Sequence, residues 1–80
     1  MNLMKDVDEH IKNDFIAVYN IVFDSNGNIN ACGRDTTKRL ILLSEQLGDC
    51  LHLGSVDYGN VYSGYMDVAA IKTLRTKVER

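Results

Sequence analysis

The stretch Phe15–Asn28 (FIAVYNIVFDSNGN) carries the strongest local signals in the chain. Its first part, as far as Phe23, is dense in β-branched and aromatic residues, which favour a β-strand. Because this strand would be apolar on both faces, we expect it to lie centrally in a sheet. The Asn-Gly pair that follows supplies the positive φ angles of a tight turn. The stretch therefore predicts a β-hairpin whose second strand runs from Ile29 to Arg34.

The same turn recurs further along the chain, which indicates an internal duplication. Gly27-Asn28-Ile29 returns as Gly59-Asn60-Val61, a shift of 32 residues (27 to 59), and Asp35 returns as Asp67. Each copy reads as strand, turn, strand, Asp and helix. Since Asp is a favoured helix N-cap, we expect both aspartates to begin helices, and Gly48 to close the first of these helices as a left-handed C-cap.

These elements predict an α+β fold with a single compact domain over residues 1–80. A helix over residues 3–13 comes first, because its apolar residues recur at helical spacing. Two ββα units follow, at about 14–48 and 50–80. We expect the α-ββα-ββα order to build a four-stranded antiparallel sheet with the helices packed on it. The strands of the second unit are predicted at about 51–56 and 61–66.

The predicted middle helix, residues 36–47, has apolar side chains on more than one side. Its inner stripe is formed by Leu40, Leu43 and Leu47. At about 100° per residue, Leu42 projects nearly opposite Leu40, and Ile41 also lies outside this stripe. Such a helix is either wedged between two layers or meets another chain. A second copy of the protein is the simplest partner, because twofold pairing is the commonest oligomer.

We therefore expect a protein partner, in the form of a homodimer or of contact with another protein. Tyrosine is favoured at interfaces because it buries a large area at low entropy cost, although core filling is the alternative for each tyrosine. The candidate interface residues are Ile41, Leu42, Tyr19 and Tyr62.

A second hypothesis is nucleic-acid binding by a basic patch. Gly33–Arg39 leads into a helix N-terminus, where free amides attract phosphate, although it is not a P-loop. The formal net charge of −2 gives the whole protein no general attraction to polyanions, so binding would depend on a local patch. The candidate residues on the second and third helices are Arg34, Lys38, Arg39, Lys72 and Arg75.

Catalytic and metal-binding patterns are weak throughout the sequence. Cys50 and His52 would share one face of a strand, but zinc needs about four ligands and a thiol nucleophile needs an orienting group. Asp24–Asn28 resembles the start of a calcium loop, yet Ile29 and Asp35 replace its required Gly and Glu. We expect no cofactor, no metal and no enzymatic activity, with a Cys50–His52 thiol site as the weaker alternative.

Cysteine use and hydropathy bear on the compartment. The chain has two cysteines in no close pair, which we interpret as reduced thiols. Neither a signal-peptide pattern nor an apolar run of about 18 residues is evident. We therefore expect a cytoplasmic protein with no membrane partner.

The stretch Ala17–Ile29 (AVYNIVFDSNGNI) also resembles the roadblock family, in its apolar strand, Asp-x-x-Gly turn and returning strand. The similarity covers about the first 50 residues, and beyond them the chain is too short for the third sheet strand of that family. The resemblance implies a homodimeric scaffold that regulates a partner and has no catalytic residues.

The sequence thus favours a small non-enzymatic protein-protein interaction or regulatory module that self-associates. Its small size and its compact duplicated form suit an accessory protein of a phage or mobile element. Nucleic-acid binding is the alternative function.

Overall fold

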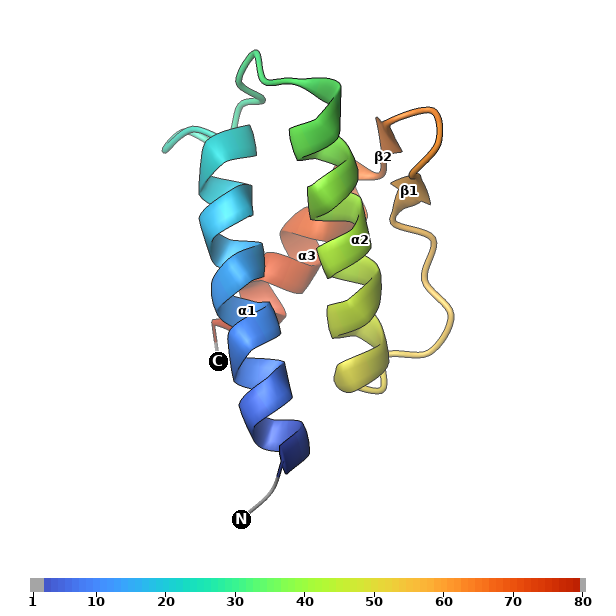
Figure 1. Ribbon diagram of the computed structural model, residues 1–80. Helices are drawn as coiled ribbons and strands as arrows, with labels where there is room; N and C mark the ends of the chain where they lie inside the picture. The colour runs from blue at the N-terminus through green and yellow to red at the C-terminus, as the bar shows by residue number, and fades with distance from the viewer. Residues whose placement is uncertain (1–2, 80) are drawn as a thin grey trace.

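The computed structural model describes the backbone of residues 3–79 and the side chains of residues 9–79. Three helices dominate the fold, α1 (Leu3–Val22), α2 (Arg34–Cys50) and α3 (Val68–Val78). Two short strands, β1 (Gly59–Asn60) and β2 (Tyr65–Met66), lie between α2 and α3 in the sequence. In Figure 1, α1 and α2 lie side by side and run in opposite directions, and α3 crosses behind them.

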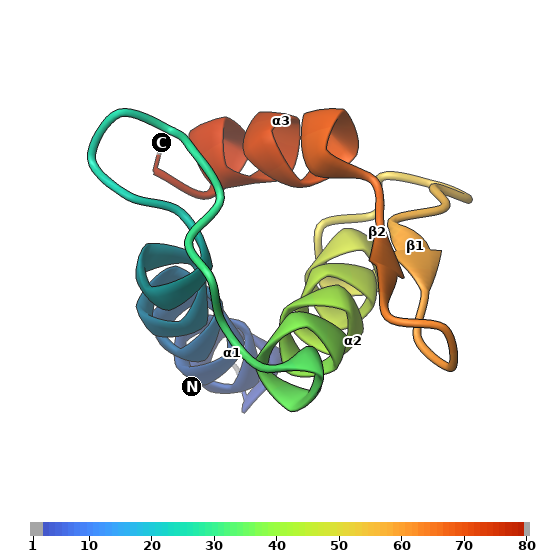
Figure 2. The ribbon, with the colours of Figure 1, turned by 90° about the horizontal axis from the view of Figure 1, so that it is seen from above.

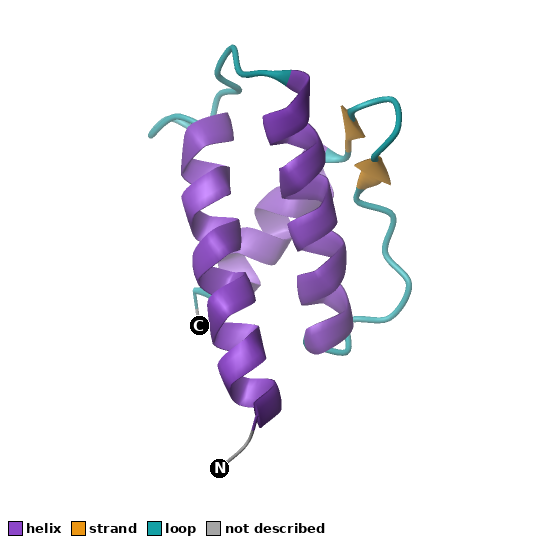
Figure 3. Cartoon of the chain, viewed as in Figure 1, coloured by secondary structure: helices purple, strands orange, loops and turns teal. Residues whose placement is uncertain are grey.

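The expected four-stranded sheet is wrong, since the described residues contain only a two-stranded antiparallel sheet. Its strands pair Gly59 with Met66 and Asn60 with Tyr65. Figure 3 shows how small this β1–β2 hairpin is beside the helices, and Figure 2 shows that it flanks α2. The order of elements is therefore two long helices, a hairpin and a third helix, in place of a duplicated ββα unit.

The sheet prediction fails because the apolar stretch after Asp14 belongs to α1. Phe15, Val18 and Val22 are buried, with 0%, 7% and 0% of their surface exposed, whereas Ile21 on the opposite side is 55% exposed. This spacing of three and four residues is that of an amphipathic helix. Packing of this face against α2 and α3 outweighs the β-propensity of the individual residues. With no strand here, the predicted strand after Ile29 has no partner beyond one isolated bridge to Phe23.

The turn after α1 is confirmed, although it connects two helices. The Asp24 carboxylate accepts hydrogen bonds from the backbone N–H groups of Asn26 and Asn28, both at 2.9 Å. Gly27 has φ of 83°, as expected, whereas Asn26 does not have the positive φ that was expected of the Asn-Gly pair. The carbonyl of Gly27 also accepts a 2.7 Å hydrogen bond from Lys72 Nζ on α3, which ties the turn to the third helix.

The predicted ends of α2 are wrong. Gly33 is its N-cap residue, and Asp35 lies inside the first turn. Gly48 lies within the helix, which continues to Cys50 and is followed by Leu51 as the C-cap residue. A Cβ at position 48 would lie 2.9 Å from Tyr58 Oη, so the glycine leaves room for the Tyr58 ring to pack against the helix.

The predicted cap of α3 is confirmed. Asp67 Oδ1 accepts a 3.0 Å hydrogen bond from the Ala70 backbone N–H. The buried residues of α3 are Ile71, Leu74 and Val78. They belong to one hydrophobic core that they share with residues of α1 and α2. Among the described residues, no helix is both long and apolar enough to span a bilayer.

Candidate functional site

The structure brings two of the four predicted interface residues together on one surface. Leu42 on the outer side of α2 and Tyr62 in the turn of the hairpin line the same groove, which has a volume of about 480 Å³. Leu42 is 46% exposed and Tyr62 is 90% exposed, so both present apolar area to solvent. We call this site the α2–hairpin groove. Its lining residues are Leu42, Glu45, Asp57, Gly59, Asn60, Val61 and Tyr62.

The hairpin turn is built so that Tyr62 points outward. Asn60 Oδ1 accepts hydrogen bonds from the backbone N–H groups of Tyr62, at 2.9 Å, and of Ser63, at 3.2 Å. The Ser63 hydroxyl in turn accepts a 3.2 Å hydrogen bond from the Tyr65 N–H. Gly59 has φ of 136°, and a Cβ there would lie 2.3 Å from the Tyr65 carbonyl oxygen, so glycine is needed for the strands to close. These contacts hold the turn without using the Tyr62 side chain.

Tyr58 anchors the hairpin to the rest of the protein. Its ring is 3% exposed and packs against Gly48 of α2, while its carbonyl accepts a 2.7 Å hydrogen bond from the Asp67 N–H at the start of α3. Burial raises the pKa of the Tyr58 hydroxyl, and the nearby carboxylate of Asp49 raises it further. The hairpin is therefore held against α2 by the contact between Tyr58 and Gly48.

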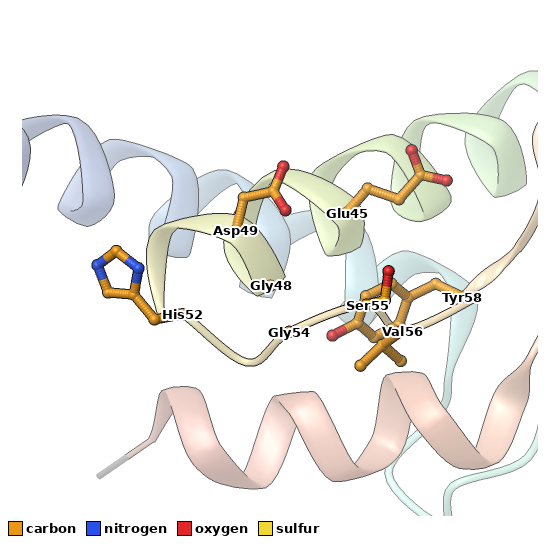
Figure 4. Close-up of a pocket in the computed structure, with 8 residues that line it drawn as sticks. All are labelled: Glu45, Gly48, Asp49, His52, Gly54, Ser55, Val56 and Tyr58. Carbon is orange, nitrogen blue, oxygen red and sulfur yellow. The ribbon is translucent and has the colours of Figure 1, made fainter.

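The surface beside the groove is acidic. Glu45 and Asp57 line the groove itself, and Glu45 and Asp49 also line an adjoining hollow of about 580 Å³. Figure 4 shows both α2 carboxylates projecting on the side of α2 away from α3, while Ser55 and Val56 lie on the loop below them. Glu45 is not among the interface residues predicted from the sequence, although it follows Leu42 by three residues and so lies on the same side of the helix.

The other two predicted interface residues lie elsewhere. Ile41 is fully buried inside the chain. Tyr19 is half-buried on α1, with its ring centroid 4.5 Å from that of Phe23 and with the guanidinium of Arg75 5.4 Å from its centre. Burial raises the pKa of Tyr19, and Arg75 lowers it by a smaller amount. Neither residue contributes to the groove, and the burial of Ile41 agrees with a helix wedged between α1 and the hairpin.

The five candidates for nucleic-acid binding are spread over two helices. Lys72 donates to the Gly27 carbonyl and lies 5.5 Å over the Phe23 ring, and Arg75 pairs with Glu79. Both cations on α3 therefore stabilise contacts within the fold. The remaining three candidates lie in the first half of α2: Arg34, Lys38 and Arg39.

The possible Cys50–His52 pair does not have the expected geometry. Residues 51–56 form no strand, so the two side chains do not share a strand face. His52 lies in a turn with φ of 55°, and Figure 4 shows its ring pointing away from the other labelled residues. No group of three or more His, Cys, Asp or Glu side chains able to hold a metal ion occurs among the described residues.

Comparisons with known proteins identify no relative of this chain. No protein-family model, curated protein or solved structure matches the chain. The roadblock resemblance is not supported either, because the segment read as its first strand is part of α1.

Proposed function

We propose that this protein is a small non-enzymatic protein-interaction module and that the α2–hairpin groove is its binding surface. The observation that carries the proposal is the pairing of Leu42, which is nearly half exposed, with the almost fully exposed Tyr62 beside one groove. Contiguous exposed apolar area next to polar residues is typical of protein interaction sites. Tyrosine is also among the residues that contribute most to binding energy at such sites.

The groove has the rigidity that a preformed binding surface needs. Leu42 lies in the third turn of a helix of 17 residues, and the hairpin opposite is held by the buried Tyr58 and by the turn hydrogen bonds of Asn60. A partner would therefore meet a backbone that is already held in place, which reduces the entropy lost on binding.

Affinity capture with matched variants tests this proposal. The tagged protein is expressed in its own host as wild type, as Leu42→Glu, as Tyr62→Ser and as the control Ile21→Glu, which changes an apolar residue on α1 that is somewhat more exposed than Leu42. We expect the amount of each specifically retained protein to fall by about tenfold or more with the two groove variants and to stay unchanged with the control. Equal retention by all four proteins would overturn the proposal.

Nucleic-acid binding remains the alternative function, and it is less favoured because Lys72 and Arg75 are engaged within the fold. Titration of labelled DNA and RNA at low and moderate salt distinguishes the two functions. A polyanion site would bind more tightly as salt is lowered. An absence of such binding at low ionic strength would remove the alternative.

A further inference from the structure

The side of α2 that borders the groove separates its charges by sign. Arg34 and Lys38 lie in the first half of the helix, Glu45 and Asp49 lie in the second half, and Leu42 lies between them. At about 100° per residue, these five residues fall within about a quarter of the helix circumference. The ion pair found among the described residues joins Arg75 to Glu79 on α3, so the four charges on α2 are not neutralised by one another.

Two of these residues are placed beside the hairpin by separate contacts. Glu45 lines the groove together with Leu42 and Tyr62. Arg34 lies next to the hairpin turn, because a Cβ on Gly64 would be 3.3 Å from Arg34 Cγ. The charged strip therefore extends along α2 on both sides of the groove, with Arg34 beside the hairpin turn and Glu45 in the groove itself.

We propose that the occupant of the groove is α2 of a second copy of this chain, lying antiparallel about a twofold axis beside Leu42. This inference rests on the proposed function. Residues 38 and 45 lie at equal distances from a point next to Leu42, and residues 34 and 49 do so from the same point. A twofold axis through that point therefore places each basic residue opposite an acidic residue of the other copy. At 1.5 Å per residue, the inner two charges lie about 5 Å from that point along the helix and the outer two about 11 Å. Lys38 thus meets Glu45 of the partner subunit, and Arg34 meets Asp49 of the partner subunit.

Charge complementarity favours this occupant over the alternatives. In a parallel pair of α2 helices, each charged residue would lie beside the same residue of the other copy, so like charges would come together. A basic peptide from another protein would match Glu45 and Asp49 but would face Arg34 and Lys38 with like charge. The antiparallel copy satisfies both halves of the strip, and each pair occurs twice. Asp35 is the exception, since it adds a negative charge to the basic half.

The apolar part of this contact is small. Leu42 would lie at the axis and Tyr62 would cover the adjacent turn of the second helix. Stable specific interfaces bury about 1,200–2,000 Å² in total and transient ones bury less, and a face centred on one leucine and one tyrosine is typical of the transient class. We therefore expect monomer and dimer to exchange, with the proportion of dimer rising with concentration.

Charge-reversal variants tested singly and as a mixture provide the experiment. Sedimentation equilibrium at low salt is measured for wild type, for Lys38→Glu, for Glu45→Lys and for their equimolar mixture, with Lys77→Glu on α3 as a control that changes the net charge as Lys38→Glu does. Each single variant places like charges in contact twice, so its dimer dissociation constant should rise about tenfold or more. In the mixture, a heterodimer of the two variants sets opposite charges against each other at both contacts between positions 38 and 45. Dimerisation should therefore return to the wild-type level.

The outcomes separate this inference from the proposed function. Recovery in the mixture, with the control unchanged, supports the antiparallel pair, because neither variant can recover through its own copy. Dimers that are weakened by neither reversal, or a mixture no stronger than the single variants, would overturn the antiparallel arrangement. A monomeric wild type at all concentrations would overturn the second copy as occupant. Capture of another protein that is lost with Leu42→Glu would then leave the proposed function standing without this inference.

Discussion

Replacing Gly48 by alanine tests how the hairpin is held against α2. In an exposed helix interior this change would stabilise the protein by about 1 kcal/mol, because glycine has the greater backbone entropy to lose. Here the new Cβ would lie 2.9 Å from Tyr58 Oη and 3.1 Å from Tyr58 Cε2, and that ring is 3% exposed. Overpacking of a filled core costs about 1–3 kcal/mol. We therefore expect a net loss of about 0–2 kcal/mol in the free energy of unfolding.

Urea unfolding followed by circular dichroism measures this change, and a double-mutant cycle assigns its cause. Tyr58→Phe removes the hydroxyl that lies nearest to the new methyl group, so Gly48→Ala should cost less in the Tyr58→Phe background than in the wild type. Gly33→Ala serves as the control, because a Cβ at position 33 meets no atom within 4 Å. A stabilisation of about 1 kcal/mol by Gly48→Ala, equal in both backgrounds, would refute the packing of Tyr58 on α2.

Three further predictions address the helices and the buried tyrosine. Phe15→Ala should destabilise the protein by about 3–5 kcal/mol and Ile21→Ala by less than about 0.5 kcal/mol in the same urea assay, and equal losses would contradict the helical face of α1. Asp67→Ala should cost about 1 kcal/mol through the lost N-cap, whereas Asp35→Ala should cost less than half of that, and the reverse order would contradict the observed caps. Burial raises the pKa of Tyr58 above 10.0 in the folded state, so the unfolded state loses this proton first as pH rises. The free energy of unfolding should therefore keep the full contribution of this group below pH 10 and lose it as pH rises further. Tyr58→Phe should reduce that loss, and an unchanged pH profile would argue against burial of the hydroxyl.

The error in the first helix has a physical cause that the sequence partly reveals. From Phe15 to Phe23 nearly every residue is apolar or aromatic, so a period of two and a period of 3.6 both fit. The inward-facing positions Ile11, Phe15, Val18 and Val22 continue one helical stripe through the expected break at residues 13 and 14. Extending the helical spacing across that break would have indicated the full length of α1. The predicted sheet would then have had no central strand for the other predicted strands to pair with.

Local chemistry was predicted more accurately than long-range pairing. The turn around Gly27 and the cap at Asp67 depend on a few neighbouring residues, and both are found where they were predicted, although the caps predicted at Asp35 and Gly48 are wrong. The exposure of Leu42 also followed from helical spacing alone. In contrast, the groove depends on where the hairpin docks on α2. That docking rests on the contact between Tyr58 and Gly48, which are ten residues apart (48 to 58), and no local pattern predicts it.

The most direct test of the binding surface is a dilution series followed by ¹⁵N–¹H NMR of the wild-type protein. We predict that the amide resonances of Leu42, Glu45, Val61 and Tyr62 shift progressively as concentration rises, because these residues line the α2–hairpin groove. The resonance of Ile21, which is exposed on α1, should stay fixed. Concentration-dependent shifts confined to α1 and the loop after it, with the groove resonances unchanged, would contradict the account.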